Sequence, residues 1–326
     1  MPAPLAIVGG WLATELLDVT SDVSALDGAG FWVVVATFEG DVTCARFGSV
    51  RPAPAPAPAP AEWRPVAGWR SSLSAARFGE GVDDIREAIA AGDVYQVNLT
   101  RRLSAPLTAA DLLPLFARLR APHAAYVSLP ARGIEIASAS PERFLRRDGD
   151  VVESRPIKGT AASAGGFLPK DRAENVMIVD LVRNDLGRVC QWGSVSVPAL
   201  CAVEAHPGLH HLVSTVRGRL RPDVGWGELL AATFPPGSVS GAPKLAALDV
   251  IGKLEPVPRG PYCGAVGWVD ADRRRADLAV AIRTFWREAG ELHFGTGGGI
   301  TWDSTAAGEW AETELKAARL LELAAT

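Results

Sequence analysis

The chain has 326 residues, of which 48% are hydrophobic and 21% are charged, and its formal net charge is -4. This composition is typical of a globular protein with one large core or two smaller ones. The slightly acidic balance leaves no surplus of cations for phosphates or anionic lipids, so we expect no nucleic acid and no membrane as partners. No apolar run reaches the about 18 residues of a membrane helix and no signal peptide is apparent, which predicts a cytoplasmic protein.

The first segment, residues 1–61, is predicted to be a short N-terminal β segment followed by a spacer. Apolar runs at 31–38 and 42–50 flank a turn and indicate a hairpin. The repeat PAPAPAPAPA at 52–61 favours an extended polyproline II conformation and adds nothing to a packed core. We expect residues 62–326 to form one compact domain that carries all the motifs described below.

Strand and helix patterns alternate irregularly through this second domain. Helices are predicted from Asp83 or Asp84 to Gly92, and at 171–186, 227–233, 242–251 and 307–323. Strands are predicted at 94–100, 124–129, 134–140, 264–270, 277–286 and 291–300. Because the order lacks a regular βαβ period, it predicts an α+β fold of packed antiparallel sheets with helices outside them.

Two pairs of carboxylates share a helical spacing. Asp171 and Glu174 lie three residues apart on one predicted helix, and Glu309 and Glu312 repeat this spacing on another. Either pair alone fits a solvated acidic face. The first helix is unusually apolar, however, and a carboxylate beside a buried helix needs a partner. Two such faces brought together would make an oxygen-rich site, and with no histidine nearby this favours magnesium over zinc.

Cationic and glycine-rich features suggest an anion site. Lys316 follows Glu312 by four residues, which fits either a helix salt bridge or a cation aimed at a substrate carboxylate. Arg283 interrupts a predicted apolar strand, and a glycine-rich turn is predicted at 295–300, where backbone N–H groups could approach an anion. A structural arginine beside a glycine-rich bend is the equally good alternative.

Three further side chains are candidates for acid–base or nucleophilic chemistry. Lys158 stands between Ile157 and Gly159 in a predicted tight turn, where loss of water would lower its proton affinity and free the amine as a nucleophile. Glu142 follows a strand and a proline, a suitable place for a fixed general acid or base. His211 is a third candidate. A surface lysine and a core histidine are the ordinary alternatives.

Ten segments of the chain together resemble the chorismate-binding enzyme family. In order they are GDVYQVNLTRRL, SASPERFL, RPIKGT, AENVMIVDLVRNDLGRV, HLVSTVRG, GSVSGAPK, RGPYCGAVGW, AIRTF, GTGGGI and EWAETELKA. The family includes anthranilate synthase component I, aminodeoxychorismate synthase component I, isochorismate synthase and salicylate synthase. The resemblance implies two stacked antiparallel β-sheets with surrounding helices, and a site for chorismate and magnesium between the sheets.

The resemblance also implies roles for individual residues. Glu174 and Glu312 match the family's principal magnesium ligands, and Glu309 matches an acidic residue of second rank. Asp171 stands where most members have glutamate, so we leave it out of the ligands. The positions that match residues holding the substrate carboxylates are Tyr262, Arg283, Gly297, Gly299 and Lys316, and those near the departing C4 hydroxyl are His211 and Glu142.

Two positions discriminate among the activities of the family. Members that activate water carry a lysine where this chain has Gln96, and lysine at position 158 is typical of the aminodeoxychorismate synthase branch. We therefore expect amination of chorismate through a lysine-bound intermediate, a step towards 4-aminobenzoate and folate. Anthranilate synthase component I and a non-catalytic chorismate-binding subunit are the alternatives. Because no cysteine fits a glutaminase, ammonia is expected from solution or, more effectively, from a glutamine amidotransferase partner.

Overall fold

The computed structural model describes residues 3–53, 63–161, 163, 165–206 and 209–326. Most of the predicted Pro/Ala spacer, residues 54–61, lies outside these ranges, so its polyproline conformation stays a prediction. Within them, no helix combines the length and the apolar composition that crossing a lipid bilayer requires.

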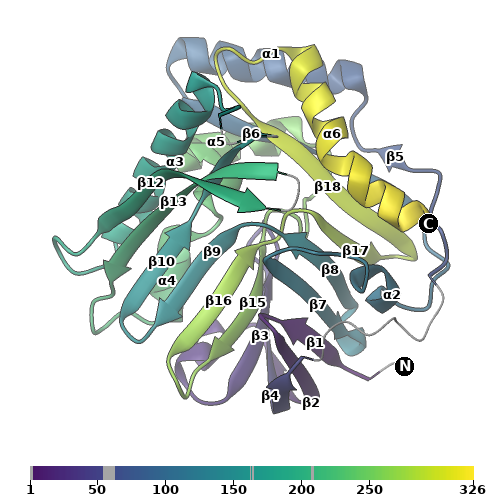
Figure 1. Ribbon diagram of the computed structural model, residues 1–326, viewed down its shortest axis with the longest axis vertical. Coiled ribbons are helices and arrows are strands. Elements are labelled where there is room, and N and C mark those ends of the chain that lie inside the picture. The colour runs from purple at the N-terminus through teal and green to yellow at the C-terminus, as the bar shows by residue number, and fades with distance from the viewer. Residues whose placement is uncertain (1–2, 54–62, 162, 164, 207–208) are drawn as a thin grey trace.

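The strands form one continuous 18-stranded antiparallel network, and the long strand β2 (Trp11–Thr20) joins its two halves, which we describe as two sheets (Figure 1). The first sheet contains β1 (Leu5–Val8), β7 (His123–Leu129), β8 (Ile134–Ser140), β17 (Thr284–Glu288), β18 (Glu291–Ile300) and β6 (Gln96–Pro106), with the short strands β5 (Arg70–Ser71) and β14 (Gly241–Ala242) paired to β6. The second sheet contains β4 (Val42–Pro52), β3 (Phe31–Ala36), β15 (Ala265–Asp270), β16 (Arg275–Val280), β9 (Arg143–Asp148), β10 (Val151–Arg155), β13 (Leu209–Arg219), β11 (Ile157–Ala161) and β12 (Ser196–His206). The joining strand β2 pairs with β1 of the first sheet and β4 of the second.

The two sheets share one apolar core. Leu99 and Ile300 of the first sheet belong to the same buried cluster as Val266 and Leu278 of the second. Burial of this apolar surface is the main force that holds the two sheets against each other. The predicted α+β fold with two stacked antiparallel sheets is therefore confirmed. The N-terminal strands are hydrogen-bonded into both sheets, because β1 pairs with β7 and β3 pairs with β15.

Helices cover the outside of the sheets. They are α1 (Ala75–Ala91), α2 (Leu113–Phe116), α3 (Pro169–Gly187), α4 (Trp226–Thr233), α5 (Lys244–Leu254) and α6 (Ala306–Ala325). Figure 1 shows α6 lying along β18, while α3 packs on β11, β12 and β13. The predicted start of α1 was wrong. Its N-cap is Ser74, whose hydroxyl accepts a hydrogen bond from the N–H of Arg77, and Gly92 ends the helix at a φ of 84° as expected.

Two predicted elements near the candidate site were also wrong. The expected strand at 277–286 is divided into β16 and β17, and Arg283 lies between them with a φ of 52°. The strand predicted at 291–300 is confirmed as β18, but the glycine-rich turn expected within it does not exist, because its ladder with β6 continues through the pairs Gly297–Thr100 and Gly299–Asn98 to Ile300. The glycines of this segment let other groups come close to the strand backbone, and they do not form a bend.

Two of the links that carry the chain from one sheet to the other lie next to each other. Between β8 and β9 the link contains Glu142, and between β16 and β17 it contains Arg283. The two links run side by side, because the N–H of Val280 donates to the carbonyl of Glu142 at 3.0 Å and the N–H of Ala139 donates to the carbonyl of Arg283 at 3.0 Å. Two candidate site residues therefore lie where both sheets meet.

Candidate active site

Side chains of α6 lie directly on the bare backbone of β18. A Cβ atom at Gly298 would lie 2.9 Å from Glu309 Oε2, 3.7 Å from Glu312 Oε1 and 3.9 Å from Lys316 Nζ. Lys316 Nζ also pairs with Glu312 at 2.6 Å and donates a hydrogen bond to the carbonyl oxygen of Gly297 at 2.9 Å. The glycine makes this approach possible, since any larger residue at 298 would displace the buried carboxylate of Glu309.

Lys158 reaches the same strand one residue further along. A Cβ atom at Gly299 would lie 3.2 Å from Lys158 Nζ and 1.9 Å from Nε2 of the buried Gln96. Lys158 is half-buried, and burial lowers the pKa of its amine, although the charges of Glu174, Glu142 and Glu312 oppose this effect. Burial thus increases the fraction of the neutral, nucleophilic amine. We call Lys158, Glu174, Glu309, Glu312 and Lys316 the carboxylate–lysine cluster.

A bulge in β11 places Lys158, which was predicted to lie in a tight turn. The ladder between β11 and β13 pairs Lys158 with Leu212 and is irregular before Thr160, where Gly159 has a φ of 78°. A Cβ atom at Gly159 would lie 3.0 Å from the Cβ of Asp171, so β11 passes very close to the start of α3. The first turn of α3 and the lysine are therefore held together.

Asp171 serves the start of α3. Its Oδ2 accepts a hydrogen bond from the N–H of Leu168 at 2.7 Å, in the position of a capping carboxylate. One turn later, Glu174 is half-buried beside Lys158. Burial raises the pKa of Glu174; the charge of Lys158 opposes this shift, and the charge of Glu312 adds to it.

The two carboxylates on α6 differ in their surroundings. Glu309 is buried; its Oε1 accepts a hydrogen bond from Ser304 Oγ at 2.6 Å, and its Oε2 has no hydrogen-bond partner among the described residues. Burial raises the pKa of Glu309, and the charges of Glu312 and Glu174 add to the shift. For Glu312 burial acts in the same direction, but the charges of Lys316, Lys158 and Lys170 and the hydrogen bond from Lys316 together outweigh it, and the pKa is lowered. The three carboxylates repel one another, and a bound cation would reduce this repulsion.

These carboxylates do not form a complete metal cage. Over the described ranges, no group of three or more His, Cys, Asp or Glu side chains is arranged to hold a metal ion. Magnesium does not need such a cage, because it commonly keeps several waters and uses one or two carboxylates together with substrate oxygens. The orphaned Oε2 of Glu309 and the mutual repulsion of the carboxylates fit a divalent cation held in this open way.

Glu142 is buried in the link between β8 and β9. Burial raises the pKa of its carboxyl from 4.5 to about 7, against the opposing effects of a hydrogen bond with Ser238, the charge of Lys158 and a backbone hydrogen bond from Ile157. A carboxyl with a pKa near neutrality can both give and take a proton under physiological conditions. The structure therefore brings a proton-transfer group into electrostatic contact with the amine.

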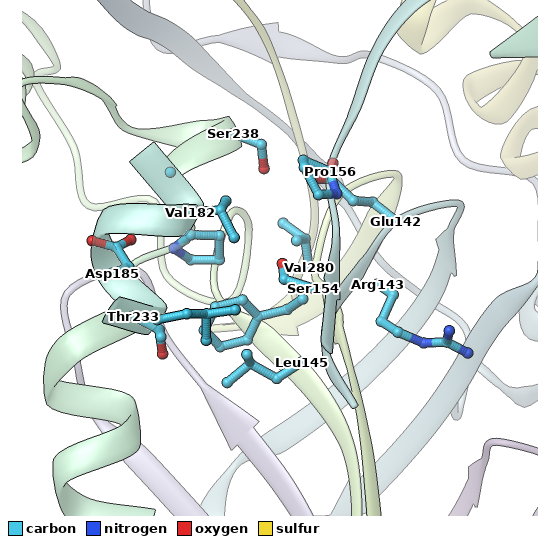
Figure 2. A pocket seen from close by; sticks show the side chains of 14 residues that line it. Glu142, Arg143, Leu145, Ser154, Pro156, Val182, Asp185, Thr233, Ser238 and Val280 are labelled. Carbon is cyan, nitrogen blue, oxygen red and sulfur yellow. The ribbon is translucent and has the colours of Figure 1, made fainter. Parts of the chain in front are cut away.

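A small cavity adjoins Glu142 (Figure 2). Its volume is about 20 Å³, and Figure 2 shows Asp185 and Thr233 on one side of it and Pro156 and Glu142 on the other. This is room for a single water molecule rather than for a metabolite. Ser238 lines the cavity as well and hydrogen-bonds the Glu142 carboxyl.

Two further candidates, Tyr262 and His211, lie against β18 and on β13. The ring of buried Tyr262 covers Gly295, where a Cβ atom would lie 2.1 Å from its Cγ. Alternate residues of a strand face the same side, so the tyrosine and Lys158 lie on one face of β18 with Gly297 between them. His211 is buried in β13 opposite Thr160.

Two residues near the cluster were not assigned a role from the sequence. Ser238 hydrogen-bonds Glu142, and Lys170 in the first turn of α3 acts electrostatically on Glu174 and Glu312. A signal for Lys170 was present, since the chain has only five lysines among its 33 basic residues. Three of the five, Lys158, Lys170 and Lys316, act on the same carboxylates.

The site thus combines an amine whose pKa is lowered by burial, a carboxyl with a pKa near neutrality and three carboxylates that repel one another. The family model for chorismate binding enzymes matches residues 39–322. The chain belongs to this chorismate-binding enzyme family.

Individual relatives agree with this assignment. The chain is 41% identical over 273 residues to aminodeoxychorismate synthase component 1 of Klebsiella aerogenes, covering 78% of this chain and 59% of the relative. It is 42% identical over 270 residues to anthranilate synthase component 1 of Streptomyces coelicolor, covering 78% of this chain and 52% of the relative. The crystal structure of anthranilate synthase component I from Streptococcus pneumoniae matches with a TM-score of 0.79 and 25% identity, covering 98% of this chain and 89% of that one. The chain thus spans about three fifths or less of the length of these curated relatives.

Proposed function

We propose that the chain aminates chorismate, as aminodeoxychorismate synthase component I does, to give 4-amino-4-deoxychorismate. The observation that carries this proposal is the half-buried Lys158, whose pKa is lowered by burial and which lies within the electrostatic influence of Glu142 and Glu174. The names of three relatives that are 39–41% identical to the chain support the same activity. The product would feed 4-aminobenzoate and folate synthesis.

In the proposed mechanism Lys158 and Glu142 act in two steps. The neutral amine of Lys158 forms a bond to C2 of the ring while the C4–O bond breaks, and Glu142 donates the proton with which the hydroxyl leaves as water. Ammonia then forms a bond to C4 as the bond between C2 and the lysine nitrogen breaks. The proton that the new C4 ammonium group loses returns to Glu142, which restores both groups.

The remaining candidates would bind and orient chorismate. Glu174 and Glu312 would hold magnesium, which neutralises the ring carboxylate when bound. The second carboxylate would meet the groups that the sequence assigns to it, namely Arg283, Tyr262, Lys316 and the backbone at Gly297 and Gly299. His211 would lie near the C4 hydroxyl. Fixing both carboxylates holds C2 and C4 in place for attack.

Ammonia is proposed to come from a glutamine amidotransferase partner. The name "component 1" of several relatives implies a second component in those proteins. Free ammonia is scarce at neutral pH because nearly all of it is protonated, so direct delivery would be more effective. High ammonium concentrations should replace the partner in vitro.

Product identification tests the proposed function. The chain is incubated with chorismate, Mg²⁺ and ammonium, and the products are separated and identified by mass spectrometry. 4-Amino-4-deoxychorismate is expected. The 42% identity to an anthranilate synthase component supports anthranilate as the second candidate product, and its fluorescence would reveal it directly. Tight chorismate binding without consumption, with an amidotransferase present, would instead indicate a non-catalytic subunit.

Removal of the proposed metal ligands should abolish stabilisation by magnesium. Glu174→Gln and Glu312→Gln should each lose most of the rise in thermal midpoint that Mg²⁺ gives the parent, because ligand binding to the folded state stabilises it. Differential scanning fluorimetry with and without Mg²⁺ measures the effect. Glu322→Gln, an exposed carboxylate on the same helix, is the matched control. An unchanged magnesium response in both ligand variants would reject the assignment.

A further inference from the structure

The helix α6 presents three different faces. One face is buried against the first sheet and contains Glu309, Thr313, Ala317, Leu320 and Ala324. A second face points towards β6, because Arg101 of that strand stacks on Trp310 at 4.0 Å and pairs with Glu314. The third face carries Glu312, Lys316 and Arg319 at helical spacings of four and three residues. Since β18 pairs with β6 on one side and β17 on the other, this third face points towards β17.

Arg283 stands immediately before β17, on the side towards which Arg319 points. The ladder of β17 with β18 begins at Phe285, opposite Phe294, and Arg283 lies two residues before it, in the direction in which β18 continues to Thr296. Thr296 is also the point where α6 contacts β18, through a hydrogen bond from its hydroxyl to the carbonyl of Thr313 at 2.8 Å. Long side chains on a helix lean towards its N-terminus, so that of Arg319 extends back along α6 towards this level.

Among the described residues, neither the half-buried Arg283 nor the exposed Arg319 has a neutralising partner for its guanidinium group. Within the described part of the chain, neither Arg283 nor Arg319 forms an ion pair or a hydrogen bond through its side chain. Arg283 is half-buried, and both burial and the charge of Arg319 lower its pKa. Its φ of 52° adds backbone strain that few non-glycine residues bear. Two like charges held together without a counterion mark a place where an anion would bind favourably.

We propose that Arg319 is a second substrate-binding arginine, which together with Arg283 binds one carboxylate of the dicarboxylate substrate. This inference rests on the proposed function, and it adds a residue to the site rather than a new reaction. A carboxylate has two oxygens with about four lone-pair positions, so it can accept hydrogen bonds from two guanidinium groups at once. Lys316, one turn earlier on the same face, donates to Gly297 and pairs with Glu312, which leaves Arg319 as the cation on this face without a partner in the described structure.

We expect Arg319→Gln to preserve or raise the thermal stability of the free protein and to weaken its binding of chorismate. Arg319→Gln removes the repulsion with Arg283, so the free variant should unfold thermally at the same temperature as the parent or slightly above it. The same variant should bind chorismate about tenfold more weakly, which is the loss of roughly 1.4 kcal/mol of charge-assisted hydrogen bonding. Its KM should rise by about the same factor while kcat changes less than about twofold, because the contact is equal in the ground and transition states.

The experiment compares chorismate-induced thermal shifts and steady-state kinetics for the parent, Arg319→Gln, Arg319→Lys and Arg64→Gln. Arg64 is exposed and makes the same change in net charge without a described side-chain contact. Arg319→Lys keeps the charge and should recover part of the affinity. Equal chorismate affinity for Arg319→Gln and Arg64→Gln would overturn the inference. Absence of chorismate binding by the parent would instead reject the proposed function, so the two failures are distinguishable.

Discussion

Lys158→Ala should abolish ammonia-dependent amination while leaving chorismate binding largely intact. Loss of a nucleophile on which a covalent step depends is expected to lower kcat at least about a thousandfold. The amine would no longer form the bond at C2, and ammonia would have no adduct to displace. The rate of product formation with saturating ammonium measures the loss, and the chorismate-induced thermal shift shows that the site still binds.

The covalent intermediate provides an independent measurement. Denaturation of the parent during turnover, followed by peptide mass spectrometry, should reveal a chorismate-derived adduct on Lys158. The exposed Lys253 on α5 is the matched control, and Lys253→Ala should react at the rate of the parent. Undiminished amination by Lys158→Ala would remove the nucleophile from the mechanism, whatever the product.

Glu142→Gln should lower kcat by about a hundredfold to ten-thousandfold, the range typical of a lost general acid. The carboxyl must carry a proton when the C4–O bond breaks. Because its pKa in the free protein is about 7, the parent's kcat/KM should fall as pH rises above neutrality, and this alkaline limb should disappear in the variant. The dependence on deprotonation of Lys158, whose pKa is lowered by burial, should remain in the variant. A pH–rate profile of parent and variant decides the assignment.

The folding stability of Glu142→Gln is the control that separates loss of catalysis from misfolding. The folded state raises the pKa of this carboxyl from 4.5 to about 7, so the folded protein binds the proton more tightly than the unfolded chain. The resulting stabilisation is complete below pH 4.5 and is lost as pH rises towards 7. Glu142→Gln removes that loss, so above pH 7 the variant should be at least as stable as the parent. A variant that is unstable at pH 8 would show that its low activity reflects misfolding.

A second variant tests the same carboxyl without removing it. The hydrogen bond from Ser238 favours the ionised form of Glu142 and lowers its pKa. In Ser238→Ala the pKa of Glu142 should therefore rise further, and the alkaline limb of the kcat/KM profile should move to higher pH. An alkaline limb that stays in place would assign it to another group.

The fold class could be predicted because alternating apolar runs and helical spacings are local properties of the sequence. Predicted strands such as Ile134–Ser140 match the structure residue for residue. The links at Glu142 and Arg283 could not be predicted in the same way, since an apolar run looks continuous whether it stays in one sheet or passes to another. The start of α1 was misplaced because two aspartates resembled a cap, whereas Ser74 is the actual one.

The candidate site could be predicted only in part. Carboxylates three residues apart on two helices suggested a shared cation site, and the structure brings Glu174, Glu309 and Glu312 within electrostatic range of one another. The spacing could not show how the carboxylates of α6 come close to strand β18. That depends on Gly298, a position inside a strand with no side chain, which the sequence had suggested was part of a turn. Tertiary contact, not local pattern, decides such details.

The joining strand β2 has a consequence for how the catalytic groups keep their spacing. Lys158 and Glu174 come from elements of the second sheet, whereas Glu312 lies on a helix packed against the first. Pulling these groups apart would require stripping β2 from β1 or from β4, and with it the interior that both sheets enclose. A motion of one whole sheet relative to the other, which would change the distance from the amine to Glu312, is therefore coupled to opening of the shared core.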